Sequence, residues 1–215
     1  SLALCKIFWM RSLALIMICA PLLGFGQIAV SSSDFADGGD TVRMSSTTDF
    51  GVDFSTTGPN SVWDYSALVA ESQTLLEFQD MSNASFLVSF IYGSFAPPSH
   101  QATYYMPSDD IPLDQLGGVL PVNITDIFQF TKVSSNDITS VGFALNVEGT
   151  EVPFKSDTIE MRYEFPLMYQ NTYDSRGYTN MDMNPVADII WRQYRTRDSE
   201  VDGYGSITTP YGTFD

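Results

Sequence analysis

The chain has 215 residues, with 26 acidic residues against ten Lys and Arg, and a formal net charge of −16. This balance makes DNA or RNA a poor partner, because phosphate backbones are bound by clusters of Lys and Arg. Both cysteines, Cys5 and Cys19, lie in the first 26 residues. The rest of the chain is therefore expected to hold no disulfide framework, thiolate nucleophile or cysteine-ligated metal site.

The first 26 residues have the pattern of a secretory signal peptide. Lys6 and Arg11 precede an apolar run over 12–23, and Gly24-Phe25-Gly26 supplies the small residues that signal peptidase requires. The apolar core of about a dozen residues is short for a membrane span, which takes about 20. We predict cleavage after Gly26 and an exported protein, secreted or on the outer cell surface, with the periplasm as an alternative location. No membrane span is expected after cleavage.

Removing residues 1–26 takes two of the ten basic residues and none of the 26 acidic ones, which leaves eight basic residues and a formal charge of −18. From residue 27 onward, runs of β-branched and aromatic residues alternate with clusters of Gly, Pro, Asn, Asp and Ser. This is typical of strands joined by turns. The expected strands are 41–45, 51–54, 61–65, 73–78, 86–92, 102–106, 126–133, 140–147, 150–155, 159–165, 189–195 and 203–208. We predict an all-β fold, an antiparallel β-sandwich or half-barrel of about ten to twelve short strands.

Two stretches are poor in strand residues. The stretch 107–121 contains three Asp and two Gly, and we interpret it as a long loop or a joint between two halves of a β-rich module over 27–215. The stretch 169–185 is rich in Asn, Asp and Gly and is expected to be irregular. Between the strands, Glu148-Gly149 is expected to form a two-residue hairpin turn.

The run 159–165 alternates strictly, with four apolar residues on one side. Glu160, Arg162 and Glu164 occupy the other side, which we interpret as a solvated face. A glycoside hydrolase needs two carboxyl groups about 5.5 to 9.5 Å apart. Glu160 and Glu164 lie about 13 Å apart along a strand, which is too far for this chemistry.

Three segments resemble a group of secreted proteins of Bacteroidetes, many of which carry a carboxy-terminal type IX secretion sorting domain. The segments are Gly58-Pro59-Asn60-Ser61-Val62-Trp63-Asp64-Tyr65-Ser66, then Phe165-Pro166-Leu167-Met168-Tyr169 with Tyr173-Asp174-Ser175, and Val201-Asp202-Gly203-Tyr204-Gly205-Ser206-Ile207-Thr208-Thr209-Pro210-Tyr211-Gly212-Thr213-Phe214-Asp215. The resemblance spans 58–215 and implies a bacterial outer-surface or secreted destination, but no reaction. Because members of the group continue into another strand and the sorting domain, it also implies that this chain is truncated at its carboxy terminus.

The same segments have a structural interpretation. Gly203 and Gly205 would allow a bulge or a close crossing of two strands, and the run 209–212 has the Pro and Gly of a turn. Trp63 and Tyr65 lie on one side of a strand and are expected to fill the core. Asp64 is expected to point away from the core or to hold a turn.

Candidate catalytic residues are few. His100 is the only histidine, and no Gly-x-Ser-x-Gly segment suggests a nucleophile for it. We interpret it as an exposed loop residue. A zinc site built on two or three histidines cannot be assembled. Calcium needs only oxygen ligands, so Asp34, Asp37 and Asp40 of the segment 34–40 are a candidate calcium site.

These observations favour a non-catalytic secreted or cell-surface module for adhesion, scaffolding or ligand binding, with an unknown extracellular ligand or surface partner. A carbohydrate-active enzyme or its accessory binding module is one alternative, which requires two carboxylates in a cleft lined by aromatic residues such as Trp63, Trp191 or Tyr194. A periplasmic carrier of an apolar ligand is the other, which requires an open apolar concave face.

Overall fold

The structure is a computed structural model that describes residues 28–48, 51–110, 122–184 and 188–215. The predicted signal peptide lies outside these residues. The described part is mostly strand, as the sequence predicts. Its elements are β1 (Ala29–Val30), η1 (Ser32–Asp34), β2 (Thr41–Ser46), β3 (Gly58–Asp64), β4 (Ser72–Glu77), β5 (Gln79–Asp80), η2 (Met81–Asn83), α2 (Phe86–Tyr92), η3 (Pro98–His100), β6 (Tyr104–Pro107), β7 (Ile124–Val133), β8 (Asp137–Val147), β9 (Thr150–Glu164), β10 (Leu167–Met168), β11 (Thr172–Asp182), β12 (Ile190–Glu200), β13 (Gly203–Thr209) and β14 (Gly212–Phe214).

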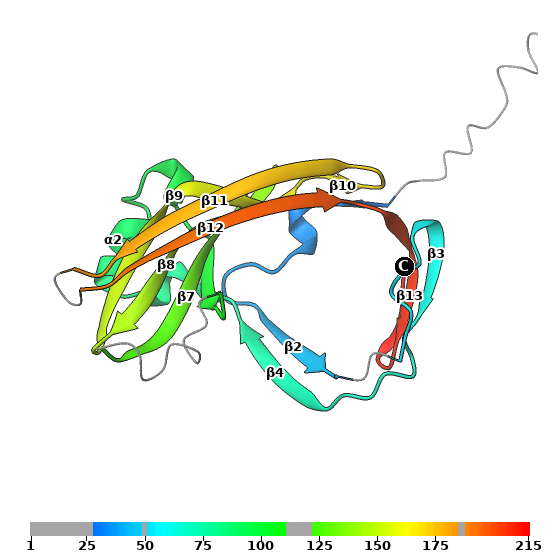
Figure 1. Cartoon of the computed structure of the whole chain (residues 1–215). Helices are drawn as coiled ribbons and strands as arrows, with labels where there is room; N and C mark the ends of the chain where they lie inside the picture. The colour runs from blue at the N-terminus through cyan, green and yellow to red at the C-terminus, as the bar shows by residue number, and fades with distance from the viewer. Residues whose placement is uncertain (1–27, 49–50, 111–121, 185–187) are drawn as a thin grey trace, which may run out of the picture.

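The largest element is a seven-stranded antiparallel sheet in the order β12-β11-β9-β8-β7-β6-β5. Sequential strands are neighbours throughout its centre, joined by short turns. At the predicted hairpin turn, Glu148 and Gly149 both have positive φ, at 51° and 81°, which matches the right-handed twist of the flanking strands. Figure 1 shows β11 and β12 as long curved ribbons that arch away from the rest of this sheet.

Helix α2 packs on one face of the large sheet. Val88 and Tyr92, one helical turn apart, are fully buried and form a cluster with Tyr105, Phe130 and Val141. The rings of Tyr92 and Phe130 stack with centroids 4.2 Å apart, and the Tyr92 hydroxyl donates to the Phe143 carbonyl at 3.0 Å. The prediction of a strand over 86–92 is therefore wrong.

The opposite face of β8 carries a second apolar cluster, because successive residues of a strand point to opposite faces. Its buried members come from β7, β8, β9, β11 and the residue after β11, and they are Ile127, Phe143, Leu145, Val147, Phe154, Met181 and Met183. Trp191 of β12 packs against this cluster. These two clusters form the apolar core of the molecule, one on each face of the large sheet.

A smaller sheet has the order β14-β13-β3, and β3 runs parallel to β13. The pairing shifts register between Gly203 and Gly205. A Cβ placed on Gly205 would lie 1.9 Å from the Ser61 carbonyl oxygen, so only glycine permits this approach. The predicted bulge or close crossing at these glycines is confirmed.

The remaining pairs are β1 with β10 and β2 with β4. Figure 1 shows β2 and β4 between the large sheet and the β13–β3 pair, while β11 and β12 connect the same two parts on the opposite side. The β2–β4 ribbon is exposed along most of its length. The predicted all-β class is confirmed, and the arrangement of sheets is consistent with the predicted antiparallel sandwich or half-barrel.

Three further predictions of secondary structure need correction. The predicted strands 150–155 and 159–165 are one continuous strand, β9. The stretch predicted to be irregular contains the eleven-residue strand β11. Residues 51–54, which were predicted to be a strand, have no regular structure. The predicted joint at 107–121 lies mostly outside the described residues.

Candidate functional site

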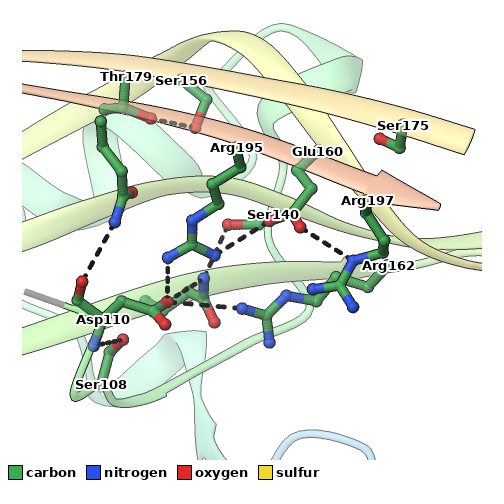
Figure 2. Close-up of polar contacts among 12 residues, drawn as sticks. Ser108, Asp110, Ser140, Ser156, Glu160, Arg162, Ser175, Thr179, Arg195 and Arg197 are labelled. Atoms are coloured by element: carbon green, nitrogen blue, oxygen red, sulfur yellow. Dashed lines mark hydrogen bonds and ion pairs between the residues drawn. The ribbon is translucent and has the colours of Figure 1, made fainter.

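The most conspicuous polar cluster of the molecule lies on the large sheet and joins Asp110, Glu160, Arg162, Arg195 and Arg197. The guanidinium of Arg195 lies between two carboxylates (Figure 2), with Nη1 3.0 Å from Glu160 Oε2 and Nη2 in an ion pair with Asp110 Oδ2. The Nε of Arg197 donates to Glu160 Oε1 at 3.0 Å. Arg162 Nη2 lies 3.5 Å from Asp110 Oδ2. We call these five residues the charge network.

Glu160 is the buried centre of the charge network. Only 3% of the residue is exposed, although the sequence predicts a solvated position. This prediction is wrong for Glu160 because β11 and β12 extend the sheet past β9 and bring Arg195 and Arg197 over it. Gly177 of β11 lets this strand pass close to Glu160, since a Cβ on residue 177 would lie 2.9 Å from Glu160 Cβ.

Asp110 anchors the segment after β6 across the sheet. Its carboxylate accepts from Gln129 Nε2 at 3.2 Å, and its carbonyl accepts from Gln193 Nε2 at 3.3 Å. Burial alone would raise the pKa of the Asp110 carboxyl, but the hydrogen bond and positive charge of Arg195, together with the charge of Arg162, lower it below its ordinary value. Asp110 is therefore held as a carboxylate.

Small hydroxyl side chains complete the layer around the charge network. Ser156 and Thr179 share a hydrogen bond of 2.9 Å, and Ser140 Oγ accepts from Gln129 Nε2 at 2.9 Å. The cavity beside Glu160 and Arg195 has a volume of about 10 Å³, the size of a single water. The charge network is thus internally paired around the buried Glu160, with no room for a substrate beside that carboxylate.

A larger hollow lies where β2 meets the turn between β13 and β14. It has a volume of about 330 Å³, at the lower end of the range for small-molecule sites. We call it the hairpin pocket. Its lining comes from three segments that are distant in sequence, and consists of Arg43, Met44, Ser45, Ser46, Thr47, Leu68, Val69, Ala70, Thr209, Pro210 and Tyr211.

Apolar and aromatic side chains of the hairpin pocket are open to solvent. Val69 is 73% exposed and Tyr211 is 67% exposed. The Tyr211 hydroxyl and Ser45 Oγ share a hydrogen bond of 2.6 Å, which joins the β13–β14 turn to β2. The pocket therefore combines an apolar lining with hydroxyl groups and one cation, Arg43. The Tyr211–Ser45 hydrogen bond holds two of its lining segments together.

The candidate calcium ligands lie in the segment 34–40, which begins at the end of η1, and each accepts a hydrogen bond from a nearby backbone N–H. Asp34 Oδ2 accepts from the Ser31 N–H at 2.8 Å, Asp37 Oδ1 from the Gly38 N–H at 2.8 Å, and Asp40 Oδ2 from the Asp37 N–H at 2.8 Å. Within the described residues, no three His, Cys, Asp or Glu side chains gather as a metal site. Calcium binding at Asp34, Asp37 and Asp40 stays a prediction, which calorimetric titration of the protein with calcium tests.

The other residues singled out from the sequence lie apart from one another. His100 is half-buried and bonds through Nε2 to the Ser156 carbonyl at 3.1 Å. The Trp63 indole donates to the Thr56 carbonyl at 2.9 Å. Trp191 and Tyr194 lie on opposite faces of β12, three residues apart, so they cannot line one cleft.

The hairpin pocket gave no signal in the sequence, because its three segments show no shared motif. The turn at Thr209-Pro210-Tyr211 was predicted, but not its contact with β2. The charge network was also missed, since Asp110, Glu160 and Arg195 are separated by 35 residues or more.

In the described ranges 28–48, 51–110, 122–184 and 188–215, no helix is long and apolar enough to cross a membrane.

Comparison with known proteins gives no family for this chain. No protein-family model, no curated protein and no solved structure matches it.

Proposed function

We propose that the chain is a non-catalytic exported β module, secreted or on the cell surface, that binds a ligand through the hairpin pocket. The observation that carries the proposal is the pocket itself: about 330 Å³ in volume, with Met44, Leu68 and Val69 beside Tyr211 and Arg43. Binding sites for small molecules share this mixture of an apolar lining with a few polar groups. The ligand class that fits is an apolar group with a polar or anionic end, which Arg43 and the hydroxyls of Ser45 and Tyr211 would contact.

The state of the charge network supports a binding role over glycoside hydrolysis. Asp110 and Glu160 both contact Arg195, but a general acid must be protonated near its working pH. The lowered pKa of Asp110 opposes that role, and both oxygens of Glu160 are bound by arginine. The exported location rests on the sequence of residues 1–26 and is tested by the amino terminus of the native protein.

A pair of matched valines tests the pocket. Val69 lines the hairpin pocket and is 73% exposed, whereas Val62 on β3 lies outside its lining and is 72% exposed. Titration with Nile red, a neutral apolar dye, should give saturable fluorescence with the native protein and with Val62→Asp. Val69→Asp should weaken dye binding about tenfold or more, because a carboxylate in an apolar site must be desolvated. Equal weakening by both substitutions, or no saturable binding to the native protein, would reject the pocket as the site.

A further inference from the structure

The outer edge of β12 is the longest strand edge that ends a sheet in the described part of the chain. β12 has eleven residues and is the terminal strand of the seven-stranded sheet, whereas β5 at the other end has two. The residues of an antiparallel strand alternate: the N–H and C=O groups of every second residue bond to one neighbour, and those of the residues between them point to the other side. Among the described residues, β12 therefore presents a row of backbone donors and acceptors beyond the sheet, and such a row is a template for pairing with another chain.

The exposed face of β12 has a sorted charge pattern. Its residues alternate between exposed and partly buried along the whole strand. The exposed ones are Ile190, Arg192, Tyr194, Thr196, Asp198 and Glu200. The cation lies in the first half of the strand and the two anions lie in the second half. A strand with this order is complementary to itself when a copy runs antiparallel to it.

Two residues of this exposed face, Asp198 and Tyr194, have contacts within the molecule that a partner chain could improve. Asp198 lies directly opposite Asp174 of β11, and like charges in that position are destabilising. Tyr194 stacks on Tyr178 of β11, with ring centroids 4.6 Å apart and an interplanar angle of 26°. Tyr194 is nevertheless 73% exposed, so a further ring can extend this stack beyond the edge of the sheet. A cation near Asp198 would offset its repulsion with Asp174, and an aromatic ring beside Tyr194 would cover its exposed side.

We propose that two copies of this chain pair edge to edge through β12, antiparallel and centred on Arg195. In this register Arg192 of each copy lies opposite Asp198 of the other, which also places a cation near Asp174. Tyr194 lies opposite Thr196 of the other copy and diagonal to its Tyr194, within reach of aromatic side chains. The four tyrosines then form one ladder across the junction. The interface is isologous, as expected for a twofold dimer.

Other arrangements of two β12 strands are less favourable. Parallel pairing in register places Arg192 beside Arg192 and Asp198 beside Asp198. Shifting the antiparallel pairing by two residues in one direction removes the ion pairs of Arg192. Shifting it in the other direction places Arg192 opposite Glu200, but it places Tyr194 opposite Asp198 and moves the two Tyr194 rings out of reach of each other. In the central register Arg195 lies opposite itself, but its charge is balanced within each copy by Asp110 and Glu160. The sorted charges therefore select the antiparallel direction, and the charges together with Tyr194 select the register.

Charge reversal with rescue tests the proposal. We expect sedimentation equilibrium of the purified protein to show a concentration-dependent dimer. Arg192→Asp should weaken it about tenfold or more, because two cross-strand pairs become repulsive. Asp198→Arg should weaken it similarly, and the double substitution Arg192→Asp with Asp198→Arg should restore it. Lys155→Asp, which changes the net charge equally on an exposed site of β9, should leave dimerisation unchanged.

Hydrogen exchange gives the second readout. The outward backbone amides of β12 should become more protected as the protein concentration rises through the dimer range. A protein that stays monomeric at millimolar concentration would overturn the proposal. So would a dimer in which β12 amides gain no protection, or a double variant that remains as weak as the single ones. If Asp198 acts only within one copy, Asp198→Arg should give a more stable monomer and leave dimerisation unchanged. This outcome would also contradict the proposal.

Discussion

A single glycine permits the close approach of β13 to β3. Gly205 has φ +155°, and a Cβ on it would lie 1.9 Å from the Ser61 carbonyl oxygen. Gly205→Ala must therefore separate β13 from β3, and we expect it to lower the free energy of unfolding by about 3 kcal/mol or more. Gly149→Ala is the matched control, because Gly149 also has positive φ but has no atom near its Cβ position. The control should cost about 1 to 2 kcal/mol. Urea denaturation of both variants measures the difference, and equal losses would contradict the close approach.

The buried carboxylate of Glu160 gives a second prediction at this scale. Glu160→Gln keeps the shape of the side chain but removes the charge that faces Arg195 and Arg197. Breaking a buried ion pair leaves the remaining charge uncompensated, so a loss of about 3 kcal/mol in stability is expected. Glu164→Gln on the same strand is exposed and should change stability by less than about 0.5 kcal/mol. Similar denaturation midpoints for the two variants would show that Glu160 is solvated after all.

The lowered pKa of Asp110 predicts how the stability of the fold depends on pH. This pKa is lower in the folded protein than in the unfolded chain, so ionised Asp110 stabilises the fold at pH values above its ordinary pKa. This contribution should be lost as the pH falls from near that ordinary value through the lower folded pKa. Asp110→Asn removes it, so the native protein should exceed the variant in melting temperature most at pH 7 and least near pH 2. A constant difference between the two proteins across this range would contradict the assignment.

At the scale of elements, the sequence predicted most strands but misassigned α2 and β11 for different physical reasons. Phe86–Tyr92 is rich in aromatic and β-branched residues, which favour strands. Its buried residues nevertheless follow the helical spacing of Val88 and Tyr92, and Ser85 caps the first turn. β11 contains Gly, Asn and Asp, which favour turns. Gly177 is needed there because the buried Glu160 leaves no space for a side chain. Both reasons depend on contacts with distant segments.

The orientation of α2 can be tested by two substitutions. In the helix Val88 is fully buried and Phe90 is 55% exposed, whereas a strand would place both on one face. Val88→Ala should therefore cost about 2 kcal/mol of stability through lost burial and an unfilled cavity. Phe90→Ser should cost less than about 0.5 kcal/mol. Guanidinium denaturation distinguishes the two, and a large loss for Phe90→Ser would favour a strand here.

At the scale of the whole molecule, the parallel pairing of β3 with β13 joins the first third of the described chain to its last residues. Figure 1 shows β12 leading into β13, which lies beside β3. The sequence indicated both strands, but parallel pairing between strands so distant has no local signature, since neither a turn nor a hairpin connects them. This contact also places the β13–β14 turn against β2 and so completes the hairpin pocket.

An engineered disulfide tests this long-range register. Val62 and Ser206 are paired residues of β3 and β13, and adjacent strands lie about 5 Å apart, within the reach of a disulfide. With Cys5 and Cys19 replaced by Ser, Val62→Cys with Ser206→Cys should oxidise readily and close a loop of about 145 residues. The oxidised form should be about 2 to 5 kcal/mol more stable than the reduced form, because the crosslink restricts the unfolded chain. Val62→Cys with Thr209→Cys shifts one cysteine by three residues, about 10 Å along the strand, and should stay reduced. Oxidation of the shifted pair in preference to the aligned pair would contradict the parallel register on which the pocket depends.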